Sequence, residues 1–140
     1  MNPGDTELVG EYGYRLALSG AWNEGCPLVA KARDLNPGPS AYYESALALC
    51  AYFDGDPQDA VMWIRKTTAP ANPNYHVIAA AIYARAGLDE EASRERDWIM
   101  ANAPKLVTNM RQELAIRFAD ASNRADFIGS LKKAGLPIPD

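Results

Sequence analysis

Apolar residues recur along the chain three or four residues apart, which is the spacing of a helix with one buried face. One stripe comprises Leu8, Val9, Tyr12 and Leu16, in a helix that Asp5 or Thr6 can cap. Similar stripes, separated by glycine and proline breaks, predict further helices over residues 22–35, 41–53, 57–67, 107–119 and 123–134, and two more within residues 73–104. The pattern therefore predicts an all-α protein.

Several turn and cap residues indicate where these predicted helices begin and end. Ser40 is a plausible cap, and Asp56 followed by Pro57 is a favoured helix start. Pro27 lies inside the helix over 22–35 and removes one backbone hydrogen bond, so we expect a bend or a late start there. Gly135 followed by Leu136 predicts a helix stop with a hydrophobic latch.

An Asn-Pro pair recurs at intervals close to 34 residues, at Asn2, Asn36 and Asn72. Counted from Pro73, small residues occupy positions 8 (Ala80) and 20 (Ala92), and Pro104 falls at position 32. Two helices hinged at Gly87 complete this unit. The segment resembles a tetratricopeptide (TPR) repeat, a helix–turn–helix unit of 34 residues.

The TPR resemblance implies a right-handed α–α superhelix of three helix hairpins, over residues of about 5–37, 40–70 and 73–104. Helices within 106–135 would form a C-terminal capping pair, so that 1–140 is a single domain. Gly13 falls at the small position of the first repeat, where a partner helix crosses. The first helices of TPR repeats line a concave groove, whose partner-binding residues here would be Glu7, Tyr14, Leu18, Glu44, Tyr52, Asn74, Val77, Arg85 and Arg111.

Composition and charge exclude several classes of function. Apolar residues make up 48% of the chain and the net charge is −4, without the clustered basic face that nucleic-acid binding requires. The N-terminus lacks the features of a secretion signal, and no apolar stretch is long enough for a membrane span. Cys26 and Cys50 are interpreted as two buried free thiols, which suits a reducing cytoplasm. We therefore expect a cytoplasmic protein.

Few residues favour chemistry over structure. His76 is the only histidine, and at a helix start it is interpreted as structural or solvent-facing. The acidic run from Asp89 suits the positive end of a helix dipole and lacks the ligand spacing of a calcium loop. Trp22, Trp63 and Trp98 lie on second helices, where core packing is favoured over a ligand surface. We predict no enzyme, and no catalytic, cofactor or metal site.

A narrower resemblance concerns the segment 40–67, with Tyr42-Tyr43 and Gly55-Asp56, and the tail 128–140. Both are similar to the C-terminal helical-repeat tail of bacterial class III adenylate/guanylate cyclases. This implies a protein–protein interaction scaffold, the regulatory or assembly tail of a bacterial signalling protein, which binds a peptide or partner helix. The alternatives are a homo-oligomerisation module, giving a homodimer, or a small-molecule sensor with an aromatic pocket near Tyr14 and Tyr52.

Overall fold

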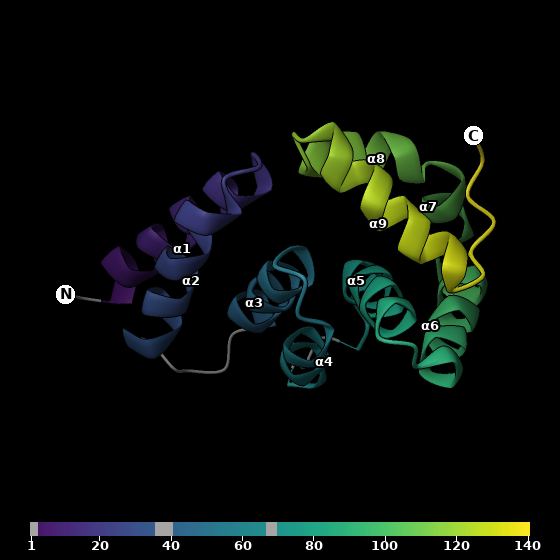
Figure 1. Cartoon of the computed structure of the whole chain (residues 1–140), viewed down its shortest axis with the longest axis horizontal. Coiled ribbons are helices and arrows are strands. Elements are labelled where there is room, and N and C mark those ends of the chain that lie inside the picture. The colour runs from purple at the N-terminus through teal and green to yellow at the C-terminus, as the bar shows by residue number, and fades with distance from the viewer. Residues whose placement is uncertain (1–2, 36–40, 67–69) are drawn as a thin grey trace. The chain divides into compact units, whose positions relative to one another are not determined.

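The computed structural model describes residues 3–35, 41–66 and 70–140, without the side chains of 3–8 and 41–43. All regular structure within these ranges is helical, which confirms the all-α prediction. The chain forms two compact units, residues 1–67 and 68–140, coloured from purple to blue and from teal to yellow in Figure 1. The predicted single superhelix over 1–140 stays a prediction, and each unit is described by itself.

The first unit contains two helix hairpins. The first pairs α1 (Pro3–Leu18) with α2 (Trp22–Leu35), and the second pairs α3 (Ala41–Phe53) with α4 (Pro57–Arg65). The two hairpins meet where α2 packs against α3. Their shared core includes the buried residues Val29, Ala32, Ala46 and Leu47. The hairpin turns use Gly20 and Gly55 with positive φ angles of 109° and 81°, a conformation that glycine adopts without a steric penalty.

Two glycines allow α1 and α2 to pack in very close contact. A Cβ atom added to Gly13 would lie 2.6 Å from the Cβ of Leu28, and one added to Gly25 would lie 2.9 Å from the Cβ of Ala17. Both distances are too short for real carbon atoms, so only glycine permits this helix crossing. The predicted helix crossing at Gly13 is confirmed.

The second unit contains five helices among its described residues. They are α5 (Pro73–Arg85), α6 (Asp89–Asn102), α7 (Pro104–Thr108), α8 (Met110–Arg117) and α9 (Ala121–Lys133). Helix α5 packs against both α6 and α9 and is buried along most of its length. The largest fully buried side chains of this unit are Ile82, Ile99, Met110, Phe127 and Leu131.

Local capping interactions explain where several helices begin and end. The side chain of Asp56 accepts a hydrogen bond from the backbone N–H of Asp59 at 3.1 Å, and Pro57 follows as the first residue of α4. At the end of α9, Gly135 has φ 100°, and the N–H of Leu136 donates to the carbonyl of Leu131. The predicted start at Asp56 and the predicted stop at Gly135 are confirmed.

Two predicted boundaries were wrong, and a third lies outside the described residues. Helix α1 begins at Pro3, before the predicted caps. Helix α2 spans Trp22–Leu35 as predicted and contains Pro27. Of the two effects expected at Pro27, the late start did not occur, and the bend stays a prediction. The predicted helix over 107–119 is divided at Asn109, whose ψ of 14° lies outside the helical range. The predicted cap at Ser40 is not among the described residues.

Candidate functional site

An open cleft in the first unit is the principal candidate site. It has a volume of about 360 Å³ and lies between α2, α3 and α4. Its lining combines aromatic, acidic and small side chains with a pair of cysteines: Trp22, Asn23, Cys26, Pro27, Ala30, Leu47, Cys50, Ala51, Phe53, Asp54, Asp59 and Trp63. We call it the aromatic cleft. Its volume falls within the range of small-molecule pockets, and it is equally able to hold one or two peptide side chains.

The two cysteines in the lining are joined by a disulfide bond. It links Cys26 on α2 to Cys50 on α3, with their Cα atoms 5.9 Å apart. The interpretation as two free thiols was wrong, because the packing of α2 on α3 brings together residues 24 positions apart in the sequence. Disulfides persist mainly in oxidising compartments. The thiol argument for a cytoplasmic location is therefore lost, and that location stays a prediction.

Three aromatic rings belong to the apolar part of the cleft wall. Trp22 of α2 stacks on Phe53 of α3, with ring centroids 4.5 Å apart and planes inclined by 30°. Trp63 of α4 carries two cations near its ring, the guanidinium carbon of Arg33 at 5.4 Å and the ammonium of Lys66 at 4.9 Å from the centroid. Both tryptophans are half-buried, and Trp63 packs against the buried core of the first unit.

The charged side chains among the described lining residues are both acidic. Asp54 belongs to the turn after α3, and Asp59 lies in the first turn of α4. Among the described residues, the lining contains neither lysine nor arginine. A cleft with two carboxylates and an aromatic wall attracts cations by Coulomb attraction and by the quadrupole of the rings.

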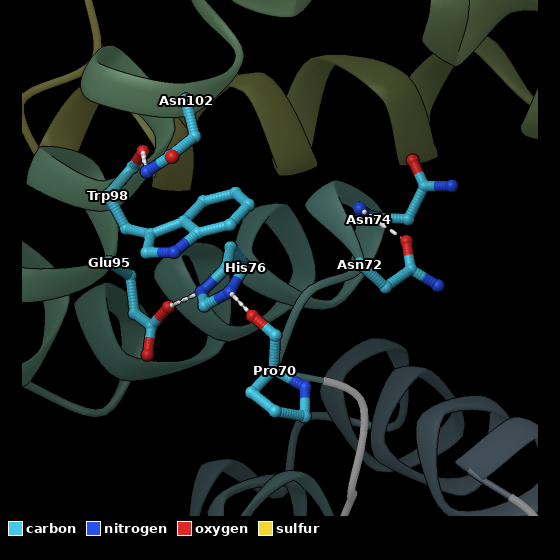
Figure 2. Close-up of polar contacts among 7 residues, drawn as sticks. All are labelled: Pro70, Asn72, Asn74, His76, Glu95, Trp98 and Asn102. Atoms are coloured by element: carbon cyan, nitrogen blue, oxygen red, sulfur yellow. Dashed lines mark hydrogen bonds and ion pairs between the residues drawn. The ribbon is translucent and has the colours of Figure 1, made fainter.

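A second candidate is the polar cluster around His76 in the second unit, which Figure 2 shows. The Nδ1 atom of His76 lies 2.5 Å from the Oε2 atom of Glu95 on α6, and its Nε2 atom lies 2.5 Å from the carbonyl oxygen of Pro70. The ring also stacks on Trp98 at a centroid distance of 3.7 Å. We call these four residues the histidine cluster.

The histidine cluster fastens three segments of the second unit together. His76 is 8% exposed, and its two ring nitrogens face an oxygen of Glu95 and the carbonyl oxygen of Pro70. The neighbouring Tyr75 hydroxyl has its pKa raised by burial and by the nearby Tyr83 and Glu95. Of the two interpretations of His76, the solvent-facing one was wrong, because the side chain is buried. Its partner Glu95 was missed because it lies 19 residues away on another helix.

The residues predicted to line a concave groove are divided between the two units. Glu7, Tyr14, Leu18, Glu44 and Tyr52 belong to the first, but the side chain of Glu7 lies outside the described residues. Tyr14 and Leu18 are half-buried on α1, and Glu44 lies 3.8 Å from Arg33. Tyr52 is 1% exposed and has no surface to offer a ligand. An aromatic pocket was predicted near Tyr14 and Tyr52. Neither residue lines the aromatic cleft.

In the second unit, the two arginines of the predicted groove have intramolecular partners. Arg85 forms an ion pair with Asp126 of α9, and the side chain of Arg111 donates to the carbonyl of Pro139 at 2.7 Å. Asn74 is half-buried at the start of α5, and Val77 is buried. The groove running through both sets of residues stays a prediction.

The described part of the chain contains neither a metal-binding cluster nor a membrane-spanning helix. No group of three or more His, Cys, Asp or Glu residues there could hold a metal ion. None of the described helices combines the length and apolarity needed to cross a bilayer. No protein-family model, curated protein or solved structure matches the chain. The function proposed below therefore rests on the geometry and on the repeat pattern of the sequence.

Proposed function

We propose that this protein is a TPR-like interaction module that binds a peptide or a helix of a protein partner, with the aromatic cleft as an anchoring point. The observation that carries the proposal is the cleft itself, an open space of about 360 Å³ with half-buried aromatic walls. Aromatic anchors seated in such clefts dominate the free energy of protein–protein binding. The repeat pattern and the resemblance to a cyclase tail support a regulatory or assembly role in a signalling protein.

A non-enzymatic role is part of this proposal. The only histidine has both ring nitrogens occupied by Glu95 and Pro70, so it is poorly placed to exchange protons with a substrate. The cleft offers two carboxylates near aromatic rings, an arrangement that suits recognition. Glu44, Asn74 and Arg85 of the predicted groove would orient the bound partner next to the anchored side chain.

Selection of peptides against the full chain tests the proposal. A random peptide library is displayed on phage and selected on the immobilised protein, and the selected peptides are titrated into isotope-labelled protein. We expect NMR shifts concentrated on the residues that line the aromatic cleft. The variant Ala30→Trp, which places a large ring in the cleft, should abolish binding, whereas Ala101→Trp at an exposed position of α6 should not.

Two outcomes of this experiment would contradict the proposal. If no selected peptide shifts the cleft residues, or if Ala30→Trp binds as well as the natural chain, the cleft is not the anchoring point. Circular dichroism of both variants ensures that a loss of binding is not a loss of folding.

A further inference from the structure

We infer that the aromatic cleft holds the side chain of an arginine from the peptide partner. This inference rests on the proposed function and deepens it, because it names the chemistry that the cleft selects. Three features of the cleft support it: the nature of the rings, the charge of the rim and the covalent link between two of its walls.

The rings provide surfaces on which a planar cation can stack. The walls contain two indoles, Trp22 and Trp63, and the ring of Phe53. Indole is the aromatic side chain that attracts cations most strongly, and the planar, weakly hydrated guanidinium stacks on it better than an ammonium does. Cations of this chain already lie near one of these rings, since the guanidinium of Arg33 and the ammonium of Lys66 are 5.4 Å and 4.9 Å from the centre of the Trp63 ring.

The rim supplies the opposite charge. Asp54 and Asp59 both line the cleft, and among the described residues no cation pairs with either carboxylate. A carboxylate can accept two parallel hydrogen bonds from one guanidinium, which adds geometric selectivity to the attraction. Charge complementarity therefore favours arginine over a neutral or acidic side chain, and the two-donor geometry favours it over lysine.

The walls are held in place before a ligand arrives. The Cys26–Cys50 bond ties α2 to α3 at the cleft, and α4 packs against α3. A binding surface fixed in advance loses less conformational entropy when the ligand binds. The cleft can therefore recognise a single side chain even though it is open to solvent.

The test compares two probes of nearly the same shape, N-acetyl-arginine methylamide and N-acetyl-citrulline methylamide, the second being neutral. Binding to the full chain is followed through the three tryptophan indole N–H signals in NMR spectra. We expect the signals of Trp22 and Trp63 to shift, with the arginine probe binding about tenfold more tightly than the citrulline probe at low salt. Trp98, which stacks on His76 in the second unit, serves as an internal control that should not shift.

Charge variants test whether Asp54 and Asp59 cause the preference for the arginine probe. The double variant Asp54→Asn/Asp59→Asn should lower the affinity for the arginine probe to that of the citrulline probe. The matched variant Asp34→Asn, at an exposed position of α2 outside the cleft lining, should leave the preference unchanged. Free arginine, whose own carboxylate the two aspartates repel, should bind more weakly than the capped probe.

Equal binding of the two probes, or an equal shift of Trp98, would overturn the inference. Its failure is distinguishable from failure of the proposed function. Selected peptides that occupy the cleft without a basic residue would leave the module a peptide binder and refute the arginine site. Conversely, a charge-dependent arginine response with no selected peptide in the cleft would support the cation site and refute the peptide-binding function.

Discussion

At the residue scale, the histidine cluster shows how one polar side chain organises its surroundings. His76 connects α5 to Glu95 on α6 and to the carbonyl of Pro70, which precedes α5. Each contact satisfies a group that would otherwise be partly removed from water without a partner, and such a group costs more than an ordinary hydrogen bond contributes. Removing the His76 side chain should therefore destabilise the second unit, because Glu95 and the carbonyl of Pro70 would lose their partner.

We predict that His76→Phe lowers the free energy of unfolding of the second unit by about 2 kcal/mol. Phenylalanine keeps a flat ring for stacking on Trp98 but cannot donate to Glu95 or Pro70. The double variant His76→Phe/Glu95→Met should lose less, because no charge remains without a partner. Urea titrations followed through resolved amide signals of α5 and α6 measure both effects.

The control is an ion pair at the surface. Glu90 and Arg94 form an ion pair whose side chains are 84% and 69% exposed, so Glu90→Gln should change the stability by less than about 0.5 kcal/mol. A change for His76→Phe as small as that of Glu90→Gln would show that the histidine cluster contributes nothing beyond a surface contact.

At the element scale, the close packing of α1 on α2 depends on the absence of a Cβ atom. We predict that Gly25→Ala destabilises the first unit by about 1–3 kcal/mol, because the added carbon would lie 2.9 Å from the Cβ of Ala17 and even closer to the α1 backbone. The matched change Gly129→Ala lies in α9, where an added Cβ meets nothing within 4 Å. It should stabilise the second unit by about 0.5–1 kcal/mol. Urea unfolding of the two variants should therefore show shifts of opposite sign.

The first turn of α9 carries a pH-dependent contribution. The side chain of Asp120 accepts hydrogen bonds from the Ser122 hydroxyl and from the backbone N–H of Asn123, and these bonds hold its pKa below the ordinary value of 3.8. A folded-state pKa below the unfolded one means that the stabilisation is present above about pH 4 and is lost as the pH falls through the folded value.

We therefore predict that Asp120→Asn flattens the acid side of the stability curve. The natural chain should be the more stable at pH 7, and its advantage should shrink steadily below pH 3.8. Melting temperatures measured by circular dichroism across this range test the sign. Two curves that stay parallel to the lowest pH would refute the role of the charged cap.

Sequence reasoning succeeded for elements with local signals and failed for contacts between distant residues. Helix α3 was predicted over 41–53, and the Asp56-Pro57 start of α4 needed only neighbouring residues. The Cys26–Cys50 bond and the His76–Glu95 contact join different helices, 24 and 19 residues apart. Helical periodicity tells which face of a helix is buried but not which neighbour covers it. The aromatic cleft was missed for the same reason. Trp22 and Trp63 lie on different helices, and the sequence does not show that they line one cleft.

At the scale of the whole molecule, the only disulfide that the two cysteines allow lies within the first unit. A bond closing a loop of this length stabilises a fold by about 3 kcal/mol, through the entropy that it removes from the unfolded chain. The second unit has its own buried core around Ile82, Ile99 and Leu131 and contains no cysteine. Reduction should therefore act on one unit and spare the other.

We predict that a reductant accelerates amide hydrogen exchange in α1 to α4 and leaves α5 to α9 unchanged. The variant Cys26→Ser/Cys50→Ser should show the fast exchange at once and respond to no reductant. If thiol titration proves reduction while the exchange of α1 to α4 stays slow, the bond is not a structural clamp. Because both cysteines line the aromatic cleft, the same reduction should also weaken binding of the arginine probe, which links the stability of the first unit to the function proposed for it.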